Sequence, residues 1–243
     1  MATEVFRDAK VFLAQFNLTS YLNELEITHG AELQDNTVFG KTTRSMAPGL
    51  ETLAFSLKGF LDFTDDLQDE IIRTRVGTQS IPVTLAMQTG LENTRAYLLQ
   101  GGLSAYDKGG AVGILAPFSL TGYASDGQKI VNGLILEDGV TARTVTGTGT
   151  ARQVGAVSAA QKVYAILHVL AYSGITNVVI KVQSDDAVGF PSATDRITFT
   201  TVTGLTSQYA TPLAGEITDD FFRVSWGITG TGSVSFMVAI GVK

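Results

Sequence analysis

The sequence contains no cysteine among its 243 residues and only two histidines, His29 and His168. Without cysteine the chain forms no disulfide bond, offers no thiolate nucleophile and binds no metal through sulfur. Its stability therefore depends on packing or on assembly. No run approaches the roughly 18 apolar residues that a membrane-spanning helix requires, and residues 1–10 lack the apolar core of a secretory signal. We expect a soluble protein that is made in the cytosol and has no membrane partner.

Positive charge is also in short supply, because 17 Lys and Arg against 23 Asp and Glu give a formal net charge of −6. Proteins that clamp nucleic acid need a cationic face that displaces counterions from the phosphates. A mildly anionic surface repels DNA instead. The charge balance therefore argues against a nucleic-acid-clamping protein.

Proline is scarce, with 5 residues, whereas 26 glycines accompany many threonines, valines and serines. This composition is typical of β-structure with tight turns rather than of helical bundles. Hydrophobic residues make up 44% of the chain and charged residues 16%, which is enough apolar material for a real core. The sequence predicts a mostly-β protein with one large domain or two smaller ones.

The chain is organised around residues 9–77. Residues 9–18 and 22–29 predict two strands joined by a turn at 19–21. In a third predicted strand, alternate apolar positions place Leu53, Phe55 and Leu57 on one face.

A helix is predicted over residues 65–76, and it is the only clear helix signal in the sequence. Thr64 is the expected N-cap, and Gly77 is the expected stop.

Residues 30–49 lie between the second and third predicted strands and lose the alternation. A compact domain rarely contains a loop of this length unless the loop contacts something. The alternative is an ordinary long β-hairpin arm.

The rest of the first half predicts further strands. Gly101-Gly102 suggests a bulge or a bend in one of them. Asp126-Gly127 is a strong hairpin signal, so we expect the last two to pair with each other. These strands cover residues 81–87, 95–106, 114–123 and 129–137 and complete a first domain over residues 1–138.

Residues 139–155 are rich in Gly and Thr, which predicts a connection between domains or, alternatively, an exposed edge strand. Residues 156–243 then predict a second, antiparallel β domain, with a hairpin turn at Gly230-Thr231-Gly232. Its expected strands cover residues 163–170, 178–182, 197–199, 222–228 and 234–242.

The residue patterns in the sequence give little support for a catalytic site. We expect His168, in an apolar strand, to be a buried imidazole, and His29 to be a turn residue. The acidic pairs at 185–186 and 219–220 are candidate calcium ligands without EF-hand spacing, and are more simply turn residues. Gly147-x-Gly149 lacks the rest of a dinucleotide loop, and Trp226 lies in an alternating run that predicts core. We therefore assign no catalytic residue, no cofactor and no metal.

One resemblance covers residues 9–138. The order of strands, the motif DNTVFGKTTRSMAPG after a strand, and the helix LQDEIIRTRVG resemble the major tail, or tail tube, proteins of long-tailed bacteriophages (siphoviruses). Contractile-tail and type VI secretion inner tubes share that fold. The resemblance implies a tail-tube-like β-sandwich or barrel with one flanking helix. The region after it would be a second antiparallel sandwich, either jelly-roll- or Ig-like, or a second tube-like module.

The resemblance also implies a role and partners. It implies a non-enzymatic virion protein, assembled in the host cytoplasm, whose copies form stacked rings around a channel for genome ejection. The rings would be hexameric, or trimeric and pseudo-hexameric if each chain supplies two modules. Other tail proteins would bind at the tube ends, and genomic DNA would pass through without specific binding.

Two residue sets follow from this role. The loop 30–49 becomes the contact between rings, because a stacking subunit needs a protruding element. Acidic residues facing the channel would repel DNA. The expected contact residues are Val38, Phe39, Lys41, Thr42, Arg44, Met46 and Pro48, and the candidate lumen acids are Glu24, Glu26, Asp65, Asp66 and Asp69.

Two other functions stay open at this stage. The pattern after residue 155 also fits a carbohydrate- or receptor-binding β-sandwich of a tail or decoration protein. An enzyme such as a glycosidase would need a carboxylate pair held across a cleft.

Overall fold

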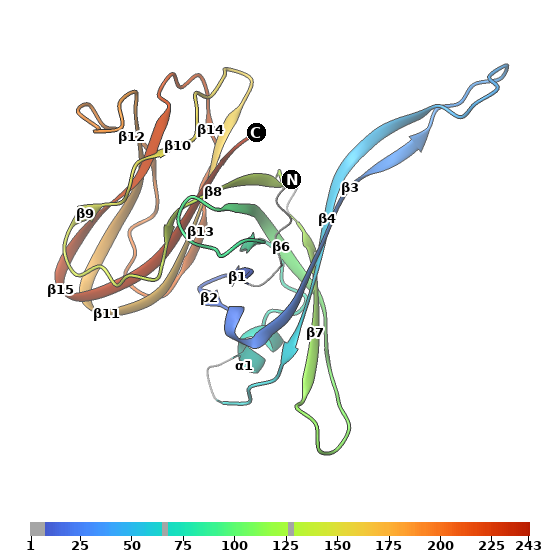
Figure 1. Cartoon of the computed structure of the whole chain (residues 1–243), viewed down its shortest axis with the longest axis horizontal. Coiled ribbons are helices and arrows are strands. Elements are labelled where there is room, and N and C mark those ends of the chain that lie inside the picture. The colour runs from blue at the N-terminus through green and yellow to red at the C-terminus, as the bar shows by residue number, and fades with distance from the viewer. Residues whose placement is uncertain (1–7, 65–67, 126–128) are drawn as a thin grey trace. The chain divides into compact units, whose positions relative to one another are not determined.

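The computed structural model describes residues 8–64, 68–125 and 129–243. They form antiparallel β-structure with one short α-helix (Figure 1), so the predicted mostly-β class is confirmed. The chain divides into two compact units. Unit 1 comprises Met1–Ser20, Ile81–Gln100 and Val131–Lys243, and unit 2 comprises Tyr21–Ser80 and Gly101–Ile130.

The two units interleave along the sequence instead of following one another. Strand β6 (Arg95–Lys108) supplies its first residues to unit 1 and the remainder to unit 2. The boundary predicted at residues 139–155 differs from this division. The difference arises because strands that pair across long stretches of sequence leave no local signal of their partners.

Unit 2 is a four-stranded antiparallel sheet in the order β3 (Leu22–Asp35), β4 (Met46–Phe60), β7 (Pro117–Ala124) and β6. Residues that pair directly across strands share a face. Leu57 pairs with both Leu25 and Leu120, and all three are buried. The predicted alternation of Leu53, Phe55 and Leu57 therefore forms the apolar face of this sheet.

The helix α1 (Gln68–Arg73) ends three residues before the predicted end at residue 76. Residues 65–67, where the predicted helix begins, lie outside the described residues. At the other end the chain leaves the helix early because it pairs with β6. Val76 forms a bridge with Leu103, and the N–H of Gly77, at φ 80°, donates to the Leu103 carbonyl.

The predicted pairing of strands 114–123 and 129–137 is wrong. Strand β7 pairs with β4 and β6, whereas β8 (Val131–Asp138) pairs with β6 and β15 (Phe221–Val242). The long strand β6 therefore separates them, pairing with β8 at its start and with β7 at its end. The Asp126-Gly127 turn on which the hairpin prediction rested lies outside the described residues.

Unit 1 is built around a long ribbon of two strands, β11 (Lys162–Asp185) and β15, which pair along their whole length. A sheet continues from this ribbon through β8, the start of β6 and β5 (Ile81–Ala86) to β1 (Lys10–Leu13) and β2 (Phe16–Asn17). The first predicted strand, 9–18, is split into β1 and β2 by a turn at Ala14, φ 52°. Short elements complete the unit, namely β9 (Gly147–Thr148), β10 (Arg152–Gln153), β12 (Thr194–Thr198), β13 (Ser207–Tyr209) and β14 (Leu213–Ala214), and a 3₁₀ turn at Thr19–Tyr21 spans the boundary between the units at residues 20 and 21.

Gly230-Thr231-Gly232 is not the predicted hairpin turn. It lies within β15, opposite Gly174 of β11, where the pairing register shifts. A Cβ on Gly174 would lie 2.8 Å from the Thr231 carbonyl oxygen, and Gly174 has φ 75°. Glycine therefore allows both strands to continue through this irregular region, and residues on either side of it, such as Val169 and Val178, share one hydrophobic core.

Two sequence predictions for buried side chains are confirmed in unit 1. His168 is fully buried, and its Nε2 accepts a hydrogen bond from Thr84 Oγ1 at 2.9 Å, while its Nδ1 contacts the Ala14 carbonyl oxygen. Burial lowers the pKa of His168 to about 4, so the imidazole is neutral near pH 7. Trp226 is only 5% exposed and packs edge-on against Phe236.

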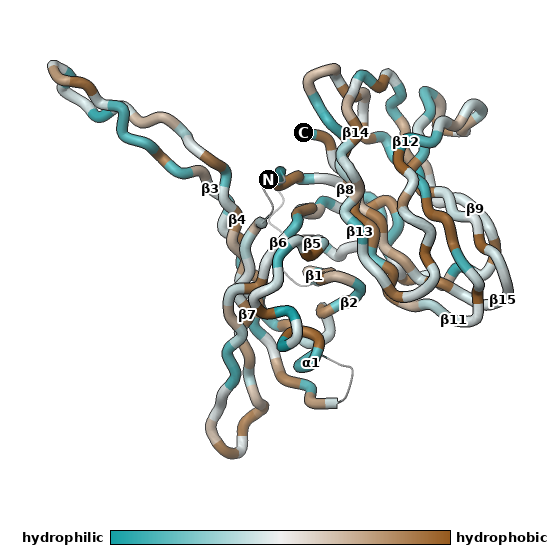
Figure 2. Tube along the Cα trace, turned by 180° about the vertical axis from the view of Figure 1, so that it is seen from behind, coloured by the Kyte–Doolittle hydropathy of each residue, from teal (hydrophilic) through white to brown (hydrophobic). Residues whose placement is uncertain are grey.

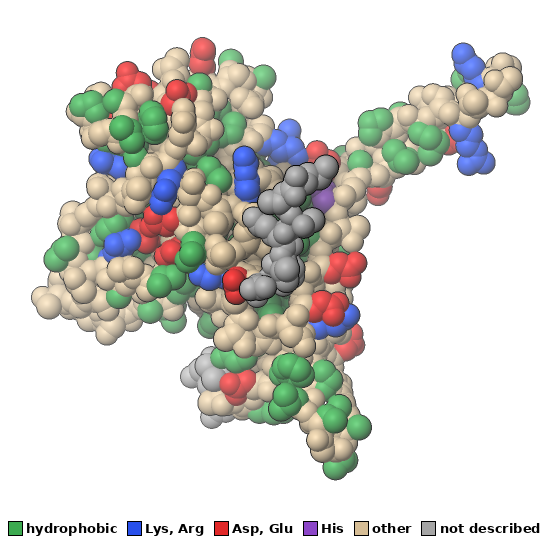
Figure 3. Space-filling view, in the orientation of Figure 1, with side chains coloured by type: hydrophobic (Ala, Val, Ile, Leu, Met, Phe, Trp, Pro, Cys, Tyr) green, Lys and Arg blue, Asp and Glu red, His purple; other side chains and the backbone are tan. Residues whose placement is uncertain are grey.

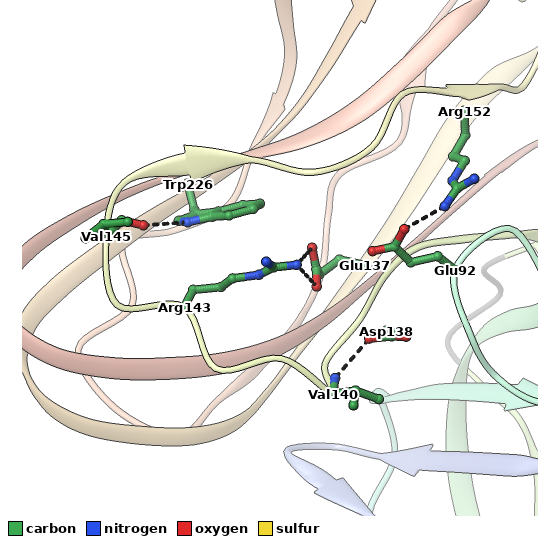
Figure 4. A network of polar contacts seen from close by, with 8 residues as sticks. All are labelled: Glu92, Glu137, Asp138, Val140, Arg143, Val145, Arg152 and Trp226. Atoms are coloured by element: carbon green, nitrogen blue, oxygen red, sulfur yellow. Dashed lines mark hydrogen bonds and ion pairs between the residues drawn. The ribbon is translucent and has the colours of Figure 1, made fainter.

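The Gly/Thr-rich segment 139–155 is held against unit 1 by polar contacts (Figure 4). A single nitrogen of Arg143 donates to both carboxylate oxygens of Glu137, at 2.7 and 2.8 Å, and the guanidinium lies over the Trp226 ring. The indole N–H of Trp226 donates to the Val145 carbonyl, and Arg152 pairs with Glu92 at 2.6 Å. Through β9 and β10 the segment also pairs with β15, so it is an ordered part of unit 1.

Candidate assembly interface

The predicted loop 30–49 is the outer part of a β-hairpin, as the alternative interpretation held. Strands β3 and β4 pair as far as Asp35 opposite Met46, but β7 pairs with β4 only from Ala54 to Phe60. Residues 46–53 of β4 therefore have β3 as their only partner among the described strands. We call the outer hairpin, residues 29–53, the arm. At about 3.4 Å per residue, its eight β4 residues extend roughly 27 Å beyond the four-stranded sheet.

The arm exposes large apolar side chains. Phe39, at its tip, is 108% exposed. Leu33 and Pro48 face each other across the strands, as do Asp35 and Met46 two positions further out, so these four residues share one face. Figure 2 shows hydrophobic residues along the arm and at its tip. The large apolar side chains that the arm exposes are Leu33, Val38, Phe39, Met46 and Leu50.

The tip is ordered by local hydrogen bonds. The amide of Asn36 donates to the Ser45 carbonyl at 3.0 Å, and the amide of Ser45 donates to Thr37 Oγ1 at 2.9 Å. The Asp35 carboxylate accepts from the Thr37 amide at 2.9 Å, and hydrogen bonds from Thr37 lower the pKa of Asp35. Gly40 takes the φ of 86° that the turn requires. The arm therefore presents Phe39 and its neighbours in a defined conformation.

All seven predicted contact residues are exposed and lie in the arm, between Val38 and Pro48. Leu33 and Leu50 join them, although the sequence analysis did not single them out. Leu33 lies among polar residues within the predicted loop, and Leu50 lies one residue beyond its predicted end; the structure shows both in the arm and exposed. His29, predicted as a turn residue, lies instead within β3, opposite Leu53.

A second exposed apolar segment lies at the other end of the unit 2 sheet. The β6–β7 loop, residues 109–116, carries Val112, Ile114 and Leu115, and Val112 is 105% exposed. Because Phe60 pairs with Pro117 and the arm continues from the opposite end of β4, this loop and the arm point away from each other (Figure 1). This surface was not predicted from the sequence, since apolar residues between glycines also fit an ordinary loop.

The uncovered face of the same sheet is polar. Glu24 pairs with Lys58 at 2.6 Å, and Glu26 lies two positions further along β3, opposite Ser56. Glu24 and Glu26 are both exposed. The other residues on this face, by register, include Thr28, Ser119, Thr121 and Asp107.

The candidate lumen acids do not all lie together. Asp69 belongs to α1, on the apolar side of the sheet, where it accepts hydrogen bonds from Tyr106 Oη at 2.8 Å and Lys108 Nζ at 2.9 Å. Burial raises the pKa of Asp69, but the bonds to Lys108 and Tyr106 outweigh it and leave the pKa lowered. Asp65 and Asp66 lie outside the described residues. Of the candidate lumen acids within the described residues, Glu24 and Glu26 share the uncovered face and Asp69 does not.

Strand β3 is an edge of the unit 2 sheet. Within the described part of the chain β4 is the only strand that pairs with it. Such an edge is a template for pairing with another chain. Acidic side chains along it, including Glu24 and Glu26, disfavour pairing with an equally acidic strand.

Unit 1 contains a cavity of ≈ 630 Å³ beside Trp226. Its charged side chains are occupied by one another: Lys181 pairs with Asp195 at 2.6 Å, and Gln183 links Asp195 to Arg223. The indole of Trp226 is buried beneath Arg143, so it offers no free ring face for stacking on a sugar.

The described residues contain no cluster of three or more His, Asp or Glu side chains placed to hold a metal ion. Both acidic pairs have members that serve local structure. Asp185 accepts from the amides of Ala187 and Ser192, and Asp219 pairs with Arg196 at 2.8 Å. Within the same residues, no helix has the length and apolar character needed to cross a bilayer.

No protein-family model matches the sequence, and no curated protein matches it. Among solved structures, a chain from the virion of a native gene transfer agent particle is 16% identical, at a TM-score of 0.44 over 53% of this chain and 98% of that one. The Dit protein of SPP1, described as a paradigm of the hub adsorption apparatus in phages that infect Gram-positive bacteria, is 12% identical. Its TM-score is 0.39 over 98% of this chain and 100% of that one.

A chain from the baseplate of phage p2 is 10% identical, at a TM-score of 0.34 over 95% of this chain and 97% of that one. All three TM-scores lie below 0.5. At that level a likeness does not assign a fold or a function.

Proposed function

We propose that this protein is a non-enzymatic structural subunit of a phage tail, and that its copies stack into a tube through which DNA passes. The observation that carries the proposal is the arm. A two-stranded hairpin that extends from its sheet without cover is marginally stable in water, and exposed apolar patches on soluble proteins mark interaction sites. The arm combines both features, so we assign it to contact between copies in successive rings.

The uncovered sheet face supports the same function. Glu24 and Glu26 project from it, and Lys58 is already paired with Glu24. In a ring, these acids would repeat in every subunit. If the face lines the channel, DNA passes without being held, because it meets no free cationic surface.

Lateral contact within a ring is assigned to the edge strand β3. Pairing of this edge with a strand of the neighbouring copy would satisfy its backbone groups, and closing the ring would leave no exposed edge. Rings of six copies fit this scheme, as do rings of three in which unit 1 acts as a second module. Other tail proteins would cap the tube ends in the virion, after assembly in the host cytoplasm.

The test is electron microscopy and sedimentation of the purified full chain. We expect stacked rings or tubes from the unmodified protein, and only rings or monomers from a variant that lacks residues 42–48. Phe39→Ser is a milder variant that keeps the arm intact, and we expect it to raise the concentration needed for polymerisation. Val188→Ser is the matched control, since Val188 is 64% exposed in unit 1. Tubes from the deletion variant that equal those of the unmodified protein would refute the role of the arm.

Carbohydrate or receptor binding by unit 1 is a second candidate function. The observation that favours it is the open cavity beside Trp226, lined by polar side chains such as Lys181 and Asp195. A glycan array separates the two functions. The tail-tube proposal predicts no glycan signal and a protein that polymerises, whereas the alternative predicts a discrete particle that binds a defined sugar.

A further inference from the structure

The end of the unit 2 sheet opposite the arm has the properties of a binding surface. The amide of Leu61 donates to the Ala116 carbonyl at 2.9 Å, which brings the chain after β4 beside the β6–β7 loop. Figure 3 shows hydrophobic side chains gathered at this end of unit 2. We call this surface the receiving end, and its exposed apolar residues are Phe60, Phe63, Val112, Ile114 and Leu115.

A recess of ≈ 280 Å³ lies at the receiving end, lined by Gly109, Pro117 and Phe118 together with Ser119, Asp107 and the ion-paired Lys58 and Lys108. A cavity of about 150 Å³ is enough to hold a benzene molecule. The recess therefore has room for an aromatic ring such as that of Phe39, which projects from the arm with no cover from the chain.

The charges of the two ends are complementary. Residues 36–50, at the tip of the arm, contain Lys41 and Arg44 and no acidic residue. The described residues at the receiving end include two acids, Asp62 and Asp107, and the two lysines beside them, Lys58 and Lys108, are each held in an ion pair. Figure 3 shows the basic side chains at the far end of the arm.

The lysines near the receiving end do not reverse this pattern. Lys58 is paired with Glu24 at 2.6 Å, and Lys108 is paired with Asp69 at 2.9 Å. Asp107 is exposed. Asp62 is half-buried, and its carboxylate accepts from the Thr64 amide.

We propose that the receiving end binds the arm of a second copy of this chain, with Phe39 at the recess and Lys41 and Arg44 near Asp62 and Asp107. This inference rests on the proposed function and names the surface that the arm contacts. Donor and acceptor lie at opposite ends of one sheet, so the contact is head to tail. Such a contact leaves a free arm and a free receiving end at the two ends of every stack, and growth continues.

The test uses two charge-reversed full-length chains. The arm variant carries Lys41→Glu and Arg44→Glu, and the receiving variant carries Asp62→Lys and Asp107→Lys. Each reversal places like charges at the contact, so we expect each variant alone to need at least roughly tenfold more protein to polymerise. In an equimolar mixture the acidic arm meets the basic receiving end, and the basic arm meets the acidic one. We expect the mixture to polymerise at nearly the unmodified concentration.

Control experiments distinguish loss of this contact from a general effect of charge reversal and from misfolding. Glu216→Lys with Asp220→Lys reverses two acids in unit 1 and is expected to leave polymerisation unchanged. Circular dichroism checks that every variant folds. Since Asp62→Lys removes a local hydrogen bond, Leu115→Ser provides a second test of the receiving end, with the same expected rise in concentration.

The outcomes distinguish this inference from the proposed function. If the unmodified chain forms no polymer, the proposed function fails, and this inference fails with it. If the unmodified chain polymerises but the mixture gains nothing over the single variants, or Leu115→Ser changes nothing, the receiving end is not the acceptor. The arm then binds elsewhere.

Discussion

Phe60, the last residue of β4, lies directly opposite Pro117, the first residue of β7. This pairing fixes the polarity of unit 2. The β6–β7 loop enters the sheet beside the end of β4, while the start of β4 continues into the arm. One sheet thus presents a basic, apolar projection at one end and an apolar surface beside Asp62 and Asp107 at the other, which is the arrangement that head-to-tail assembly requires.

The first prediction concerns Gly122, which lies under the Phe55 ring on the apolar face of unit 2. A Cβ at residue 122 would lie 2.1 Å from Phe55 Cζ. We expect Gly122→Ala to destabilise the protein by about 1–3 kcal/mol, because the ring must leave its packed position. Chemical denaturation measures this effect. Gly204→Ala is the control, since a Cβ there has no neighbour within 4 Å, and equal denaturation midpoints for the two variants would contradict the packing described.

The second prediction concerns pH. His168 is neutral in the folded state with its pKa lowered to about 4, whereas an unfolded histidine titrates near 6.5. The unfolded state therefore binds the proton more readily, so this contribution to stability is complete above pH 6.5 and is lost as the pH falls toward 4. The shift corresponds to a loss of about 3 kcal/mol at most.

We expect unfolding measured between pH 7 and pH 5 to show this loss in the unmodified chain. His168→Gln, which keeps a hydrogen-bonding side chain but does not titrate, should show a shallower slope over the same window. Carboxylates titrate in both proteins, so the difference between the two slopes reports His168. Parallel slopes would mean that the imidazole is not buried in its neutral form.

The third prediction concerns the ion pair between Glu137 and Arg143. The Glu137 side chain is only 1% exposed, and burial raises the pKa of its carboxyl despite the opposing effect of Arg143. Arg143→Met would leave the carboxylate buried without its charged partner, at a cost of about 3–5 kcal/mol. We expect Glu137→Gln combined with Arg143→Met to recover much of this stability in thermal unfolding. If Arg143→Met alone is as stable as the unmodified chain, segment 139–155 is held by other contacts.

The fourth prediction concerns the uncovered face of unit 2. In Glu26→Lys, assembled tubes would carry an added cation in every subunit beside the channel. We expect these tubes to retain DNA at low salt and to release it as the salt concentration rises, because lysine binding to phosphate displaces counterions. Glu26→Gln removes charge without adding a cation, and Glu216→Lys adds one in unit 1. DNA retention that is equal in the two lysine variants would place Glu26 outside the channel.

Local patterns in the sequence predicted the β class, the apolar face of β4 and the burial of His168 and Trp226. These features depend on alternation within one strand, which short stretches record. The pairing of β11 with β15 along their whole length could not be predicted from alternation within one strand. Gly230-Thr231-Gly232 suggested a hairpin turn, and only the pairing with β11 shows that these glycines let the ribbon continue.

The candidate interface likewise has one part that the sequence predicted, the arm, and one part that it did not, the receiving end. The long polar stretch after β3 indicated a projecting element, and its apolar members Val38 and Phe39 were visible in the sequence. The receiving end was not predicted, because it combines two segments that become neighbours only through the pairing of β4 with β7. The separation of Asp69 from Glu24 and Glu26 likewise depends on which side of the sheet α1 covers.

The most direct test of the central claim is a cryo-electron microscopy reconstruction of the assembly formed by the full chain. We predict a repeating tube in which residues 30–49 of each copy lie against residues 109–116 of a copy in the next ring. A chain that stays monomeric at high concentration and inside virions, or a tube in which the arm touches no other copy, would contradict the account.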